Sequence, residues 1–207
     1  SGKLDNAQDF KKGLNIIVSE SRRLTKMVEE LLEFSRIEDG RFNLNIEMID
    51  IQAEFEDAVY TYREFFKKEG IELNYTDPER EFPPLPGDPE RLRQVFSNLL
   101  DNAAKHGGSG KRIDTTIGEE EGYAAIVIRD YGSGIPEEEL PHVKEKFYKG
   151  SSKARGNGIG LAVCDEIIQR HGGRLDIDNA KDGHGCVVTI LLPMTSATPT
   201  PAPTTPD

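Results

Sequence analysis

The residues best suited to chemistry are two asparagines, Asn98 and Asn102, on a predicted helix that begins at Asp88. Side chains four positions apart share one face of a helix. An amide oxygen is a hard, neutral ligand suited to Mg²⁺, which also binds nucleotide phosphates. Lys105 and His106 lie about one turn further on and can reach phosphate oxygens as a point charge and a donor. Ordinary solvent exposure is the alternative for the asparagines, but the apolar stripe of this helix lies on its other side.

A second phosphate-binding pattern is the glycine series Gly156, Gly158 and Gly160, which leads into a predicted helix from Ile159 to Gln169. Backbone amides at a helix N-terminus bind phosphate through unpaired donors and the helix dipole. The series is not a Walker loop, because no Gly-Lys-Ser/Thr follows it. It is not a dinucleotide-binding fingerprint either, because the segment before it reads as a loop rather than a strand.

Asp130 ends an apolar strand and is followed by Gly132 and Gly134. A carboxylate beside a pocket can accept a hydrogen bond from the exocyclic amine of adenine, whereas guanine has a carbonyl at that place. The two glycines would let the backbone pass close to the base, since they carry no Cβ. A plain turn after a strand is the alternative.

The charge-rich segment from Leu140 to Gly156 has no clean period, and we expect it to act as a lid that nucleotide orders. Lys146 and Lys149 could neutralise a terminal phosphate, although a solvated run of charge is the alternative. The aromatic pair between them, Phe147 and Tyr148, would anchor the lid.

The elements that must position these residues follow from hydrophobic periodicity and breaker residues. Helices are predicted from Asp5 to Arg41, from Ile51 to Lys68, from Asp88 to near Gly107 and from Ile159 to Gln169. Strands are predicted over 42–49, 71–75, 112–117, 123–129, 174–178 and 185–192, and a proline-rich loop over 78–86. The Thr, Pro and Ala tail over 195–207 cannot bury a core and should be disordered.

Composition excludes several classes of protein. The net charge of -11 argues against a nucleic-acid partner, because phosphate backbones attract Lys and Arg. No apolar run approaches the ~20 residues that cross a bilayer. Cys164 and Cys186 lie far apart, so buried thiols are favoured over a disulfide or a zinc site.

Four segments in one order resemble the N box, first glycine box, F box and second glycine box of the sensor histidine kinase ATP-binding domain. They are Asn98 to His106, Asp130 to Pro136, Lys146 to Lys149 and Gly156 to Leu161. The same superfamily holds gyrase, heat-shock chaperone and mismatch-repair ATPases. The segment from Arg23 to Glu38 is similar to the second helix of the family's dimerisation hairpin. The resemblance runs from about Leu24 to Pro193.

The resemblance implies an α+β, two-layer sandwich of the Bergerat type: a mixed, largely antiparallel sheet with three main helices on one face, preceded by a long N-terminal helix. It divides the chain into a partial dimerisation helix (1–41), an ATP-binding catalytic domain (42–194) and the tail. It implies ATP and Mg²⁺ as cofactors, with Asn102 as the metal ligand. Asn98, Lys105, Lys146 and Lys149 would be the catalytic group. The residues implied to bind nucleotide are Asn98, Asn102, Lys105, His106, Asp130, Gly132, Gly134, Ile135, Phe147, Tyr148, Gly156, Asn157, Gly158, Ile159, Gly160 and Leu161.

The implied reaction passes the γ-phosphoryl group of Mg-ATP to a histidine for relay to a response regulator. The implied setting is the cytoplasmic part of a membrane-anchored bacterial sensor kinase that forms a homodimer through its helical hairpin. None of the four histidines has the context of the family's phosphoacceptor, so we interpret the chain as part of a longer kinase. A natural protein without the acceptor is the alternative.

Several positions depart from the family pattern. Lys144 stands where an earlier Phe of the F box is usual. Lys146 and Lys149 stand where Arg is frequent, and a lysine cannot make the bidentate phosphate contacts of an arginine. Cys186 replaces a Thr that helps to hold adenine. These departures leave open a degenerate module that only binds nucleotide or a partner. An anti-sigma-factor serine kinase of the same superfamily is a third possibility, against which the hairpin-like first helix argues.

Overall fold

The computed structural model describes residues 42–148, 150 and 158–194, together with scattered positions between 10 and 39. The chain divides into two compact units, residues 1–42 and 43–207. In the first unit, the described residues from Phe10 to Arg36 are helical, as the sequence predicts. An apolar seam runs along these helical residues at helical spacing, and its members are between 46% and 65% exposed: Leu14, Ile17, Leu24, Val28 and Leu31. No described helix is long and apolar enough to cross a membrane.

The second unit is built on a five-stranded sheet with the order β2-β4-β5-β7-β6. β2 and β4 run parallel, and every other neighbouring pair is antiparallel. The mixed, largely antiparallel sheet that the sequence predicts is therefore confirmed. The strands are β2 (Glu72–Thr76), β4 (Arg112–Glu120), β5 (Tyr123–Asp130), β6 (Arg174–Asn179) and β7 (Cys186–Pro193).

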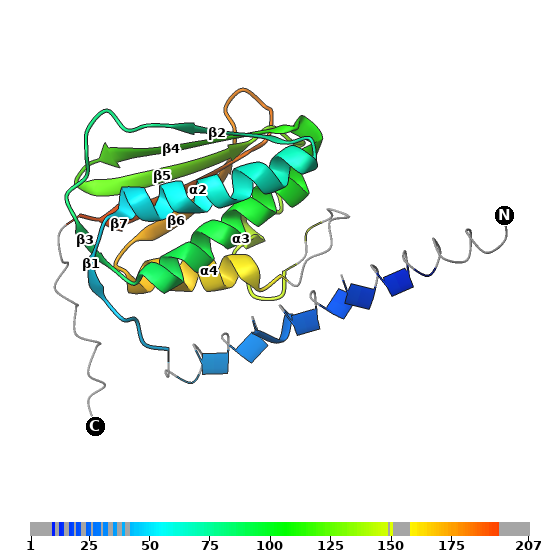
Figure 1. Ribbon diagram of the computed structural model, residues 1–207, viewed down its shortest axis with the longest axis horizontal. Helices are drawn as coiled ribbons and strands as arrows, with labels where there is room; N and C mark the ends of the chain where they lie inside the picture. Colours follow the sequence, from blue (N-terminus) through cyan, green and yellow to red (C-terminus); the bar gives the residue numbers. More distant parts are fainter. Residues whose placement is uncertain are drawn as a thin grey trace. The chain divides into compact units, whose positions relative to one another are not determined.

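Three helices cover one face of this sheet, with α3 between the other two (Figure 1). They are α2 (Ile51–Lys68), α3 (Pro89–Gly107) and α4 (Gly160–Arg170). α3 begins where its sequence signals predict, because Asp88 accepts the N–H of Arg91 at 3.1 Å and a proline follows it. Two single-turn 3₁₀ helices, η1 (Gly108–Gly110) and η2 (Leu140–His142), lie in the connections.

The core forms between the helices and the inner face of the sheet. In β5, Ala124, Ile126 and Ile128 are buried at alternate positions, as expected of a strand with one packed face. Above them, Phe55 of α2 meets Phe96 of α3 edge to face, with ring centroids 5.1 Å apart. Each such fully buried side chain contributes about 1.5–3 kcal/mol.

Two sequence-based expectations are corrected by a small second sheet. The alternating segment 42–49 forms a strand only over β1 (Glu47–Ile49), and the proline-rich loop ends in a strand, β3 (Leu85–Gly87). β1 and β3 pair antiparallel, with Met48 opposite Pro86. The strand β3 was missed because it is supported by pairing with Glu47–Ile49, a segment far away in the sequence that no local pattern connects to it.

Candidate functional site

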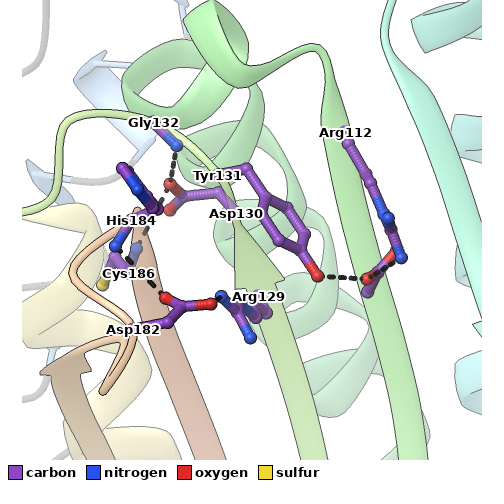
Figure 2. A network of polar contacts seen from close by, with 9 residues as sticks. Arg112, Arg129, Asp130, Tyr131, Gly132, Asp182, His184 and Cys186 are labelled. Atoms are coloured by element: carbon purple, nitrogen blue, oxygen red, sulfur yellow. Dashed lines mark hydrogen bonds and ion pairs between the residues drawn. The ribbon is translucent and has the colours of Figure 1, made fainter.

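The alternation of β5 sends Asp130 toward the helices, in line with the buried Ile128 and Ile126. Its side chain is 7% exposed. Oδ1 accepts the backbone N–H of Gly132 at 2.9 Å and that of Cys186 at 3.3 Å (Figure 2). Burial raises the pKa of Asp130, and the two backbone hydrogen bonds oppose that rise.

The second carboxylate oxygen of Asp130, Oδ2, makes no hydrogen bond with the described part of the chain. It is also not among the described polar atoms that are both buried and unpartnered, a group that contains only Nε of Arg129. Among the described residues, no donor occupies Oδ2. One oxygen of Asp130 is fixed by the backbone, and the other can accept a donor from a ligand.

Glycines make the close packing around Asp130 possible. A Cβ on Gly107, the last residue of α3, would lie 2.2 Å from the Cβ of Asp130, and a Cβ on Gly132 would lie 2.6 Å from the Cα of Gly107. A Cβ on Gly185 would lie 1.9 Å from the carbonyl oxygen of Asp130. The end of α3, the end of β5 and the start of β7 thus meet backbone to backbone at this carboxylate.

The predicted amides and cations of α3 differ in exposure, and Lys105 and His106 are the exposed pair. Asn98 is 8% exposed, so it lies at the edge of the buried stripe rather than opposite it, and Asn102 is half-buried. The amides of Asn98 and Asn102 make no hydrogen bond within the described residues, and neither has a fully buried, unpartnered polar atom. Nζ of Lys105 lies 3.9 Å from Asp101, which is too far for a hydrogen bond.

His106 adjoins Asp130 at the end of α3. Its ring keeps an exposed edge, while desolvation of the remainder and the charge of Lys105 hold its pKa below the ordinary value. Asp130 opposes that shift by favouring the imidazolium form. The net shift favours the neutral ring, which can serve as a hydrogen-bond donor or acceptor beside the carboxylate.

The N-terminus of α4 has no side-chain cap. Ile159 stands at the N-cap position, is 5% exposed and offers no side-chain acceptor to the first backbone N–H groups. A Cβ on Gly160 would meet no atom of the described residues within 4 Å. Unsatisfied N–H groups at a helix start favour an anion. Leu161, also predicted to bind nucleotide, is half-buried in this turn.

The segment before α4 is tied to it at two places. The N–H of Phe147 donates to the carbonyl of Gly158 at 2.7 Å, and a Cβ on Gly158 would lie 2.4 Å from the carbonyl oxygen of Tyr148. Nζ of Lys144 donates to Oδ1 of Asp165 in α4 at 3.0 Å. The third and fourth sequence boxes thus lie side by side, and Lys144 supplies a polar anchor where the family pattern has Phe.

A residue that the sequence analysis missed holds the loop after β5. Asn179, at the end of β6, accepts the N–H of Ile135 at 2.7 Å and donates to its carbonyl at 2.6 Å. A Cβ on Gly134 would lie 2.7 Å from Oδ1 of Asn179. No local signal marks this asparagine, because its partner is 44 residues away in sequence.

The structure thus brings the end of α3 to Asp130, and the 144–148 segment to the start of α4, with α3 and α4 in contact. Lys146 and Phe147 are exposed in that segment. Lys149, Gly156 and Asn157 lie outside the described residues, as do most of the expected lid beyond Tyr148 and the expected disordered tail. Cys164 and Cys186 are both buried, as predicted.

Residues 87–196 match the family model "Histidine kinase-, DNA gyrase B-, and HSP90-like ATPase". Among curated relatives, the signal transduction histidine-protein kinase AfsQ2 of Streptomyces coelicolor is 36% identical over 189 residues, which cover 90% of this chain and 34% of AfsQ2. The chain spans about a third of the length of the curated relatives it matches.

Solved structures show the same fold. The mycobacterial sensor histidine kinase MprB is 30% identical with a TM-score of 0.60, over 73% of this chain and 99% of that one. The histidine kinase ThkA in complex with the response regulator protein TrrA is 24% identical with a TM-score of 0.71, over 90% of this chain and 52% of that one. These matches confirm the predicted fold class and the resemblance read from the four boxes.

Proposed function

The chain belongs to the family of histidine kinase-, DNA gyrase B- and HSP90-like ATPases and contains the ATP-binding catalytic domain of the sensor histidine kinase type; we propose how its residues hold Mg-ATP and what they do with it. The adenine end would lie at Asp130 and the phosphate end between α3, the 144–148 segment and the start of α4. Base and phosphates would then contact different elements of the fold.

The geometry of Asp130 carries the proposal. Because Gly132 and Cys186 occupy Oδ1, the carboxylate cannot rotate freely, and Oδ2 is left to accept the exocyclic amine of adenine. Guanine would place a carbonyl oxygen against this carboxylate, and two acceptors repel each other. Gly132 and Gly134 would let the base approach the backbone, and Ile135 is held in place by Asn179.

The phosphate end would use backbone donors and side-chain cations. The uncapped N–H groups from Gly160 onward would bind phosphate oxygens, and Lys105 and Lys146 would neutralise their charge. The amide oxygen of Asn102 would hold magnesium, which would neutralise phosphate charge; the fit is supported by the absence of any hydrogen bond from that amide within the described residues. Roles for Lys149, Gly156 and Asn157 remain predictions from sequence.

The reaction we infer is transfer of the γ-phosphoryl group to an imidazole nitrogen of a histidine on a helix of the intact kinase. In such transfers protein groups mainly position the reactants and neutralise charge. Asn98, at the phosphate site, carries no carboxylate that could activate water as a general base. An amide here would therefore favour transfer to protein over hydrolysis.

We also propose protein partners and a cellular location for the intact kinase. The response regulator bound in the ThkA complex supports a similar partner for the phosphorylated histidine of this protein. The exposed apolar seam of the first unit supports a homodimer through a helical hairpin in the intact protein. We propose a cytoplasmic location within a membrane-anchored sensor.

Two measurements test the proposal. Calorimetry of the chain with ATP and Mg²⁺ should show saturable 1:1 binding that is lost without the metal or with GTP. A separately produced fragment that carries a family acceptor helix should then gain acid-labile phosphate from ATP. Nucleotide binding without transfer would favour the degenerate module, and acid-stable phosphoserine on an added protein would favour the serine kinase.

A further inference from the structure

The residues on either side of Asp130 point to the opposite face of the sheet. Because side chains alternate along a strand, Arg129 lies on the face away from the helices, and Tyr131, just after the strand, contacts Arg129 and Asp114 there. The antiparallel register places Arg129 opposite Asp114 of β4 and Val187 of β7. The outer face at this end of the sheet therefore carries a polar network directly behind the base-recognition carboxylate.

Tyr131 is the centre of that network. Its ring lies between two guanidinium groups, 4.9 Å from Arg112 and 4.4 Å from Arg129, and its hydroxyl donates to Oδ2 of Asp114 at 2.6 Å (Figure 2). Arg112 donates to both oxygens of Asp114 at 2.8 and 2.7 Å. These contacts fix the guanidinium of Arg129 over the outer surface of the strand end.

Arg129 connects this network to the turn between β6 and β7. Its guanidinium forms an ion pair with Oδ2 of Asp182, whose Oδ1 accepts the N–H of His184 at 3.2 Å. The turn itself closes through a hydrogen bond from Ala180 to Gly185 at 3.0 Å. Oδ1 of Asp182 thus stabilises the turn itself, and Oδ2 connects the turn to Arg129 of β5.

The turn leads directly into the residue that orients Asp130. Gly185 packs against the carbonyl of Asp130, and the next N–H, from Cys186, donates to Oδ1 at 3.3 Å. That distance lies just beyond the usual 2.7–3.2 Å range, so a shift of a few tenths of an ångström would break the bond. Oδ1 would then be held by the N–H of Gly132 alone, and the direction of Oδ2 toward a ligand would be less firmly fixed.

We propose that Arg129 and Asp182 are positioning residues for adenine recognition: their ion pair, behind the sheet, holds the 180–185 turn so that Cys186 can orient Asp130 toward the base. The inference rests on the proposed function, since it assigns adenine to Asp130. It adds two residues outside all four sequence boxes. Neither would touch the nucleotide.

The test compares Asp182→Asn with Asp176→Asn. Asp176 also forms an exposed ion pair on β6, with Arg174 at 2.6 Å, so its substitution removes the same charge away from Asp130. Calorimetry would use ATP and purine riboside triphosphate, which differs from ATP only by lacking the amine. We expect Asp182→Asn to weaken ATP binding about three- to fivefold, the scale of an exposed ion pair, and to leave the analogue unchanged.

Two further measurements separate positioning from general loss of structure. Hydrogen exchange at the Cys186 amide should become faster in Asp182→Asn but not in Asp176→Asn, and Asp182→Glu should restore part of the ATP affinity. Equal ATP affinity in Asp182→Asn and the wild type, or equal weakening of ATP and its analogue, would overturn the inference. Failure of the wild type to prefer ATP over the analogue would instead overturn the assignment of adenine to Asp130.

Discussion

Replacing Asp130 by asparagine should convert an adenine-selective site into one that disfavours adenine. The substitution keeps the shape of the side chain. The amide oxygen would stay at the Oδ1 position, where it still accepts the N–H groups of Gly132 and Cys186 at 2.9 and 3.3 Å. The amide nitrogen must then occupy the Oδ2 position, and it would present a donor to the adenine amine, which is also a donor.

The expected magnitude follows from the loss of one charge-assisted hydrogen bond. Such a bond is worth about 1.5–3 kcal/mol, so ATP should bind roughly ten- to a hundredfold more weakly. The fold should not suffer, because burial already raises the pKa of Asp130 and thus makes its charge unfavourable. An uncharged amide removes that cost, and the melting temperature at pH 7 should be no lower than in the wild type.

Inosine triphosphate provides the internal control. It carries a carbonyl in place of the amine, so the amide nitrogen of Asp130→Asn can donate to it. Calorimetry should therefore show ATP binding falling while inosine triphosphate binding rises, which no general damage to the site would produce. Equal losses for both nucleotides, or unchanged ATP affinity, would refute the assignment of Asp130 to the base.

Three other outcomes follow from the described contacts. Asn102→Ala should abolish magnesium-dependent phosphotransfer with an unchanged melting temperature, because the amide makes no hydrogen bond within the described residues; full transfer at saturating magnesium would show that another group holds the metal. Lys144→Met should lower the free energy of unfolding in urea by about 1–2 kcal/mol and speed hydrogen exchange at Phe147, since Asp165 loses its ammonium partner at 3.0 Å; unchanged exchange would show that the tie is dispensable. His171 is buried and its pKa is lowered, so the folded state binds fewer protons than the unfolded state and stability should fall as pH drops below about 6.5. His171→Gln should flatten that fall in urea titrations, and an equally steep fall would contradict the assignment.

The sequence predicts α3 well because its signals are local. Asp88 and Pro89 mark the start, the apolar stripe gives the period, and the structure places the helix at Pro89–Gly107. The same holds for α2, which the structure gives the predicted bounds, Ile51–Lys68. Elements of this length with clear caps carry enough local information to be read from one sequence.

Contacts between distant segments could not be predicted in the same way. Asn179 and Asp182 carry no local signal, yet they fix the loop after β5 and the turn before β7. Their partners lie 44 and 53 residues away, and only the antiparallel pairing of β5, β7 and β6 brings them together. Lys144 was predicted only in part. The sequence shows that a lysine is unusual at this position, but it does not show that Asp165 is its partner.

The two ends of the site depend on different kinds of structure. Asp130 stands at the end of a central strand and is held by backbone groups from α3 and β7, so base selectivity rests on the rigid sheet. The phosphate end rests on the start of α4 and on a segment tied to it by the Phe147–Gly158 and Lys144–Asp165 contacts. Substitutions behind the sheet should therefore change which base is bound, and substitutions around α4 should change how strongly the phosphates are held. Binding free energies of ATP, ADP and an analogue without the amine, measured on each variant, would separate the two effects. The contribution of the base cancels in the difference between ATP and ADP. The contribution of the phosphates cancels in the difference between ATP and the analogue.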